Sequence, residues 1–351
     1  MSSVNKRYQE LLHKIYNKGF EYEDPNRKGV IRKQISYYNF EHDFEDGFPI
    51  IGLKQTYPKM AFNEMKAFMM GKTNLKDLED LGVTFWRDDA YNYFLKHFDS
   101  KKTQEEFLEM VKKGYYSGDL DKPYYVYGDL GKIYSHQIRN WNGVIDQLNE
   151  VLERLKKEPN STKNIVTMWN PSDLDSCALS PCHTRFSFIV ENLNWRQRNK
   201  IYEEKGNWVT MDGENIEKAY NDWFDTVGIP KYGLRVQWNQ DSVDTFLGLP
   251  INIKYYSFVC YVFAHYLGMK PLGIIGNLSN VHLYDNSFSA VEEILKFNPD
   301  DLETIKIETD FTKEWYNLDD YLKQLDFAEN IKIEDYKHLG RFDVKMLSYS
   351  K

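Results

Sequence analysis

Cysteine is scarce in this sequence. Its 351 residues include only Cys177, Cys182 and Cys260, and none of these stands in a CxxC spacing. Three cysteines cannot all pair, so the sequence predicts neither a disulfide framework nor a zinc knuckle, and a reducing, cytoplasmic setting fits best. The eight histidines form no HxxxH or HExxH spacing, so no metal site is predicted.

Long apolar runs and an excess of positive charge are also missing. The most apolar stretch, residues 251–269, is interrupted by Lys254, Ser257 and His265, so it is interpreted as a buried core helix rather than a membrane span. The first residues lack the apolar segment of a secretion signal. A net charge of −8 disfavours a nucleic-acid partner held by its phosphates.

Apolar periodicity predicts a mixture of helices and strands. Helical spacing marks residues 8–16, 60–70 and 145–158, and strand composition marks residues 164–169, 185–190, 234–238, 304–308 and 331–333. The alternation favours an α/β or α+β domain, with the strands at 185–190 and 234–238 paired. About forty polar residues separate those two strands, and we interpret residues 191–232 as a surface insertion in a single domain spanning residues 1–351.

Two side chains are candidates for proton or covalent chemistry. Cys182 lies in the sequence SPCH at the start of a predicted strand, where a neighbouring Arg or protonated His would lower the pKa of its thiol and make it a nucleophile. A free cysteine is more often a small buried hydrophobe. Glu64 lies in the apolar helix FNEMKAFMM, where it is either a proton shuttle with a raised pKa or a surface-facing residue.

Three further residues are candidates for ligand recognition. Asn252 falls in the first turn of the apolar helix, where an Asn usually caps the helix but can also offer an amide donor and acceptor to a planar ligand. His282 and Tyr284 stand two apart in VHLYDN and so share one face of a strand. Such a pair is more often part of a core than of a binding site.

Taken together and in order, these segments resemble the thymidylate synthase family, which includes the pyrimidine nucleotide hydroxymethylases of phages and antibiotic pathways. The resemblance rests on NRKG, DGFPI, GKTNLKDLEDLGVTFW, DLGKIY, NIVTMWNPSDLDSCALSPCH, DSVDTFLGLPINI and NVHLYDN. It implies a homodimer built on a large bent mixed β-sheet flanked by helices, with the subunits meeting through the sheet. It also implies one-carbon transfer from 5,10-methylenetetrahydrofolate to C5 of a uracil nucleotide, in the cytoplasm of a cell or of a viral host.

The resemblance assigns roles residue by residue. It implies that Cys182 attacks C6 of the pyrimidine, that Glu64 assists proton transfers, that Asn252 reads the O4/N3 edge of the base, and that His282 and Tyr284 hold the sugar. The catalytic set is Cys182, Glu64, Tyr134, His183 and Asp244. The substrate-binding set is Arg27, Gln240, Asp241, Ser242, Asn252, His282, Tyr284 and Lys163, and the folate-binding set is Trp86, Leu179 and Asp244. The resemblance also implies that Thr162 and Lys163 face the partner's site and that the C-terminal residues form a lid.

The sequence departs from the family pattern around the phosphate and the lid. Asp241 replaces the arginine of the family's QRSxD motif, and Thr162 and Lys163 replace an arginine pair. Asp89 stands where the family usually has a second Trp, and the end of the chain, DVKMLSYSK, is polar. Because a wetter site favours water over hydride as the final acceptor, we expect deoxyuridylate hydroxymethylation. The alternatives are thymidylate synthesis, the same chemistry on another pyrimidine nucleotide or nucleoside, and an inactive nucleotide-binding paralogue.

Overall fold

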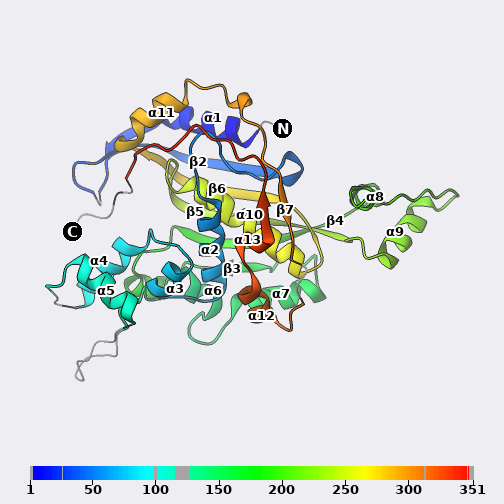
Figure 1. The fold of residues 1–351 in the computed structure, drawn as a ribbon, viewed down its shortest axis with the longest axis horizontal. Helices are drawn as coiled ribbons and strands as arrows, with labels where there is room; N and C mark the ends of the chain where they lie inside the picture. The colour runs from blue at the N-terminus through cyan, green and yellow to red at the C-terminus, as the bar shows by residue number, and fades with distance from the viewer. Residues whose placement is uncertain are drawn as a thin grey trace.

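A computed structural model describes residues 3–25, 27–98, 101–114, 126–311, 314–345 and 347 (Figure 1). The helices are α1 (Val4–Lys18), α2 (Pro58–Met69), α3 (Leu75–Asp80), α4 (Arg87–His97), α5 (Gln104–Lys113), α6 (Tyr134–Arg139), α7 (Gln147–Lys157), α8 (Trp195–Glu204), α9 (Ile216–Thr226), α10 (Leu249–Tyr266), α11 (Phe288–Ile294), α12 (Leu318–Gln324) and α13 (Phe327–Asn330). The strands are β1 (Phe20–Glu23), β2 (Ile31–Asp43), β3 (Ile165–Thr167), β4 (His183–Asn192), β5 (Tyr232–Asp244), β6 (Lys270–Tyr284), β7 (Ile307–Thr309) and β8 (Ile331–Ile333).

Six of these strands form one mixed sheet in the order β1-β2-β6-β5-β4-β3. β5 and β6 are parallel and are joined by α10, whereas the other neighbours are antiparallel. The α/β fold expected from the sequence is therefore confirmed, as is the pairing of β4 with β5. The long strands β5 and β6 end beside the start of β2, and this edge of the sheet supplies several side chains to the site.

Helix α10 lies on the sheet as the central core element. The Trp238 ring on β5 stacks on the Tyr256 ring of α10, with 4.8 Å between their centroids. Gly276 on β6 makes this possible, because a Cβ there would lie 2.5 Å from the Trp238 ring. The apolar stretch is thus a buried helix, as expected, and no helix within the described residues has the length and hydrophobicity that a membrane span needs.

Some predicted element boundaries were wrong. The strand expected at 164–169 is reduced to β3, in which only Val166 is buried, because the chain then turns into the short 3-10 helix η2 (Pro171–Ser176). The strand expected at 304–308 is β7, which begins three residues later, ends at Thr309 and pairs with β8. β8 occupies the predicted residues 331–333.

The polar segment between β4 and β5 forms the helices α8 and α9, which extend away from the rest of the molecule in Figure 1. It has a small core of its own, made of Leu193, Ile201, Tyr220, Phe224 and Ile229. The buried Arg198 links the two helices through Asn221 Oδ1 at 3.1 Å. That this segment is an insertion into one domain stays a prediction.

One face of the sheet is polar and only partly buried. Its partly exposed side chains come from the neighbouring strands β4, β5 and β6 and include Arg185, Ser187, Gln237, Asn239 and Asn277. They lie side by side in the strand registers, and Asn277 donates to Asn239 Oδ1 at 3.4 Å. The opposite face carries Val236 and Trp238 and packs on α10.

Candidate active site

A cleft of about 660 Å³ collects side chains from segments that are far apart in the sequence. This is a usual size for a site that encloses a small organic ligand. Thirteen predicted site residues line it: Arg27, Glu64, Trp86, Tyr134, Leu179, Cys182, His183, Gln240, Ser242, Asp244, Asn252, His282 and Tyr284. Their placement in one cleft leaves the roles that the resemblance gives them as predictions.

Cys182 lies directly before β4, and as a partly exposed residue it lines the cleft. Its backbone N–H donates to the hydroxyl of Tyr134 at 2.8 Å. Tyr134 is the first residue of α6, so this bond connects the helix to the loop that presents the thiol. Cys177 and Cys260 are buried and unpaired, as small core residues would be.

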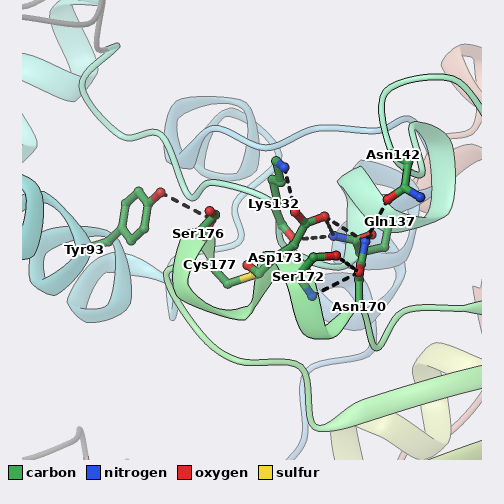
Figure 2. Close-up of polar contacts among 9 residues, drawn as sticks. All are labelled: Tyr93, Lys132, Gln137, Asn142, Asn170, Ser172, Asp173, Ser176 and Cys177. Atoms are coloured by element: carbon green, nitrogen blue, oxygen red, sulfur yellow. Dashed lines mark hydrogen bonds and ion pairs between the residues drawn. The ribbon is translucent and has the colours of Figure 1, made fainter.

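A polar network around Asp173 holds α6 against that loop (Figure 2). The Asp173 carboxylate accepts hydrogen bonds from Lys132 Nζ at 2.6 Å, Gln137 Nε2 at 3.0 Å and Asn170 Nδ2 at 2.9 Å. Gly131 has a φ of 69°, and a Cβ there would lie 2.0 Å from the carbonyl oxygen of Ser176. The close approach of the two segments therefore requires glycine, and it fixes Tyr134 relative to Cys182.

The charge state of the thiol differs from the expectation. Burial raises the pKa of the Cys182 thiol to about 11, with Asp89 and Asp241 raising it further and Arg27 opposing them. His183 cannot supply the expected positive charge, because burial lowers its pKa to about 3 and Nδ1 is hydrogen-bonded to Tyr256 Oη at 2.8 Å. Of the two groups expected to lower the thiol pKa, the neighbouring arginine, Arg27, acts in that direction, whereas His183 does not.

Glu64 is buried rather than surface-facing. The residue belongs to α2 and its side chain is buried, and Oε1 accepts a hydrogen bond from Trp86 Nε1 at 2.9 Å. Burial raises the pKa of its carboxyl to about 7, although the Trp86 hydrogen bond acts in the opposite direction. A carboxyl with this pKa exchanges protons readily near neutral pH.

Asn252 does not cap its helix, because α10 begins at Leu249 and Asn252 lies within the first turn. Its Nδ2 donates to Gln240 Oε1 at 3.1 Å, and Trp238 Nε1 donates to the same oxygen at 3.3 Å. The shared acceptor fixes the orientation of Gln240. The side-chain oxygen of Asn252 and the side-chain nitrogen of Gln240 can therefore bind a ligand that has a donor and an acceptor on one edge.

His282 and Tyr284 reach the cleft from the end of β6. Nδ1 of His282 lies 2.7 Å from the carbonyl oxygen of Asn280, and that oxygen can only accept, so Nδ1 carries the proton. Burial lowers the pKa of His282, and its Nε2 is left buried as an acceptor with no hydrogen-bond partner among the described residues. Tyr284 Oη accepts from Arg27 Nη1 at 3.0 Å.

Arg27 is held in place by several groups. Its Nε donates to the carbonyl oxygen of Leu347 at 3.1 Å, and its guanidinium lies 5.1 Å from the centre of the Tyr284 ring. The carboxylate of Asp24 is 3.5 Å from Nη1. The C-terminal segment thus contacts the cationic side chain that lines the cleft beside Tyr284.

Asp244, Trp86 and Leu179 form another part of the cleft wall. Asp244 Oδ1 accepts the backbone N–H groups of Phe246 and Leu247 at 2.9 and 3.0 Å, which fixes the carboxylate at the turn before α10. Trp86 packs edge-to-face on Tyr134, with 6.2 Å between ring centroids. The wall combines flat apolar surface with one anchored carboxylate.

Three predicted site residues lie outside this cleft. The side chain of Asp241 is exposed, and its backbone N–H donates to Cys182 O at 2.8 Å. Thr162 and Lys163 are also exposed and do not line the cleft of their own chain. Within the described ranges, no group of three or more His, Cys, Asp or Glu side chains lies together as a metal site would require.

The structure adds residues that the individual motifs did not identify. From the C-terminal segment, the cleft is lined by Arg341, Asp343, Val344, Lys345 and Leu347, so the described part of the predicted lid does reach the site. Met346 and residues 348–351 lie outside the described residues. Tyr256 also lines the cleft, and its spacing of four residues from Asn252 on one helix was the available signal.

A partly exposed cysteine, a buried carboxyl and an oriented amide pair in one cleft are the groups that covalent catalysis on a planar substrate needs. A family model described as thymidylate synthase matches residues 6–348. The chain belongs to the thymidylate synthase family and is a one-carbon transferase. Members of this family use 5,10-methylenetetrahydrofolate, bind deoxyuridine monophosphate and are typically dimeric.

Several bacterial relatives extend over nearly the whole chain. The thymidylate synthase of Mycoplasma genitalium is 30% identical over 316 residues, which cover 90% of this chain and 93% of the relative. That of Malacoplasma penetrans is 29% identical over 334 residues, covering 94% and 96%. These names favour methylation and do not support the hydroxymethylation or the phage origin considered from the sequence.

Proposed function

We propose that the protein catalyses the reductive methylation of C5 in a deoxyuridine monophosphate-like nucleotide, with 5,10-methylenetetrahydrofolate as the one-carbon donor. The main support is the convergence of Cys182, Glu64 and the Asn252–Gln240 pair in one cleft. When bound, the folate supplies the one-carbon unit and the hydride that completes the methyl group. The rest of the reaction is assigned to side chains of this chain.

Cys182 Sγ forms a bond to C6 of the uracil ring, and the C5–C6 electron pair makes C5 nucleophilic. The Asn252–Gln240 pair meets the O4/N3 edge: the side-chain oxygen of Asn252 accepts from N3–H, and the amide nitrogen of Gln240 donates to O4 and stabilises the enolate oxygen that develops there. Glu64, with its pKa about 7, serves the proton transfers at this oxygen and at C5. Tyr134 fixes the loop that carries the thiol.

The remaining cleft residues bind and orient the two ligands. His282 Nε2 accepts a hydrogen bond from a sugar hydroxyl, and the hydroxyl of Tyr284 forms a second hydrogen bond with the sugar. The positive charge of Arg27 attracts the phosphate. The residues present fit a folate, because Trp86 and Leu179 offer an apolar wall for a flat ring and Asp244 offers an anchored acceptor. A folate packed against this wall excludes water from the reacting carbon.

We further propose that the polar sheet face is the homodimer interface. Its side chains include Ser187, Gln237 and Asn277, which lie in adjacent strands and are only partly buried in the single chain. Thr162 and Lys163 are exposed in their own subunit, which fits a role at the partner's cleft. A cytoplasmic location stays a prediction.

The test is to incubate the protein with deoxyuridine monophosphate and 5,10-methylenetetrahydrofolate and to determine the mass of the nucleotide product. A gain of one methylene unit with stoichiometric dihydrofolate supports methylation. A gain of one formaldehyde unit without dihydrofolate would instead establish the hydroxymethylase, and no product would contradict both. Cys182→Ser is the matched inactive control.

A further inference from the structure

Three of the groups assigned around the Cys182 thiol, namely His183, Tyr134 and Arg27, are poor acceptors for its proton. Burial holds the thiol pKa at about 11, so the thiolate fraction at pH 7 is only about 10⁻⁴. His183 is hydrogen-bonded to Tyr256, and the Tyr134 hydroxyl already receives the Cys182 N–H. Arg27 is a cation and cannot take a proton.

Asp89 lies in the first turn of α4 and lines the same cleft as Cys182. Among the described residues its carboxylate makes no hydrogen bond or ion pair, whereas the adjacent Asp88 receives one from Gln104 at 2.7 Å. The charged groups that act on Asp89 are Asp88 on its own helix and Arg27 from the loop after β1. The other charged groups lining the cleft are Glu64, Arg87, Asp244, Arg341, Asp343 and Lys345.

We propose that Asp89 is the catalytic base that receives the proton of the Cys182 thiol. This rests on the proposed function, because it assigns the first step of that reaction. The Sγ–H bond breaks as its proton passes to the Asp89 carboxylate, and the sulfur electron pair forms the bond to C6. The C5–C6 electron pair moves to C5 and O4, and at the end of the cycle the C6–S bond breaks and the proton returns to sulfur.

The electrostatic surroundings fit this role. Burial raises the pKa of Asp89 to about 6, and the charge of Asp88 raises it further while Arg27 opposes the shift. The carboxylate is therefore mostly ionised at neutral pH, yet more basic than an ordinary aspartate, which is the condition for an efficient general base. Its negative charge also raises the thiol pKa, so the two groups are coupled.

Asp89→Asn separates this role from a merely electrostatic or structural one. Losing the negative charge lowers the thiol pKa, so iodoacetamide should alkylate Cys182 faster than in the wild type. Losing the base should slow the addition to C6, and exchange of the C5 hydrogen of deoxyuridine monophosphate in D₂O should fall by about 100-fold. The two rates are thus expected to change in opposite directions.

Asp89→Glu retains a carboxylate and should restore part of the exchange rate. Asp80→Asn changes an exposed aspartate of α3 and should alter neither rate. Circular dichroism and thermal unfolding establish that each variant is folded, and mass spectrometry of the Cys182 peptide quantifies alkylation.

The outcomes are distinct. Faster alkylation of Asp89→Asn with unchanged or faster exchange would mean that Asp89 only repels the thiolate. Slower alkylation together with slower exchange would mean that Asp89 positions the loop that carries Cys182. Either result overturns the proposal. Failure of the wild type to exchange C5–H or to form product would instead contradict the proposed function. The wild-type exchange rate should also fall below a pH of about 6 as Asp89 is protonated, and Asp89→Asn should lack this step.

Discussion

The backbone N–H of Cys182 donates a hydrogen bond to the hydroxyl of Tyr134 over 2.8 Å, although the two residues lie 48 positions apart. The bond joins the first residue of α6 to the residue before β4. The position of the thiol is therefore set by a side chain from a different layer of the fold. This makes the attachment of α6 a determinant of reactivity.

Replacing Tyr134 with Phe tests this relationship. The variant leaves the Cys182 N–H without its acceptor, which costs about 1–3 kcal/mol when the group is buried. We expect the rate of adduct formation at Cys182 to fall by about tenfold or more, with little change in overall fold. Tyr91→Phe is a matched control, because Tyr91 donates to the carbonyl oxygen of Lys102 away from the cleft; an equal loss in both variants would contradict the role of Tyr134.

The Asp173 network gives a prediction on stability and pH. Its hydrogen bond with Lys132 keeps the pKa of Asp173 below the ordinary 3.8. A lowered carboxyl pKa contributes stability that is present above 3.8 and is lost as pH falls through the lower folded pKa. Asp173→Asn should therefore lower the free energy of unfolding by about 1–3 kcal/mol at pH 7 and remove this acid-dependent contribution.

The measurement for Asp173→Asn is urea unfolding between pH 3 and pH 7, together with the rate of C5–H exchange. The control is Asp175→Asn, which changes a neighbouring residue with no side-chain hydrogen bond in the described structure. If Asp173→Asn and wild type differ equally at every pH, the ionised carboxylate is not the source of the stability.

Much of the site was predictable because its residues fall in contiguous motifs. Cys182 and Asn252 lie at the start of elements predicted from the sequence, His282 and Tyr284 stand two apart in one short motif, and the structure brings all four to one cleft. The local interpretation of Asn252 as a cap was wrong because the helix begins three residues earlier, at Leu249. A boundary shift of that size moves a residue from the cap position into the first turn of the helix.

Other features depend on contacts between distant segments. The Arg27–Leu347 hydrogen bond and the three bonds to Asp173 join segments whose separation in space no periodicity specifies. The contribution expected of a protonated His183 to the thiol pKa is missing, since this histidine is neutral once buried against Tyr256. Burial, which decides the charge, is a property of the folded chain.

The buried Lys254 on α10 predicts a stabilising substitution. Its Nζ has no hydrogen-bond partner among the described residues, and burial together with the charge of Lys54 lowers its pKa well below 10.5. The unfolded chain holds this proton more tightly, so stability rises with pH between the lowered pKa and 10.5. Lys254→Met should raise the free energy of unfolding at pH 7 by about 1–3 kcal/mol and flatten this rise.

Thermal and urea unfolding between pH 7 and pH 10 test Lys254→Met. The exposed Lys157 offers the control Lys157→Met, which should leave the pH dependence unchanged. A destabilised Lys254→Met with an unaltered pH profile would show that Lys254 is not buried without a partner.

Glu64→Gln separates catalysis from stability at one buried carboxyl. The folded pKa of about 7 lies above the ordinary 4.5, so the wild type loses stability as pH rises from about 4.5 to about 7. Gln resembles the protonated form and should be more stable than wild type at pH 8, by at most about 3 kcal/mol. Without a group that exchanges protons, its turnover should fall by about 100-fold or more. The measurements are turnover and urea unfolding, and the control is Glu150→Gln, a change of an exposed residue on α7 that should affect neither. Full turnover in Glu64→Gln would show that Glu64 takes no part in the proton transfers. Equal stability of Glu64→Gln and wild type at pH 8 would mean that the Glu64 carboxyl keeps an ordinary pKa.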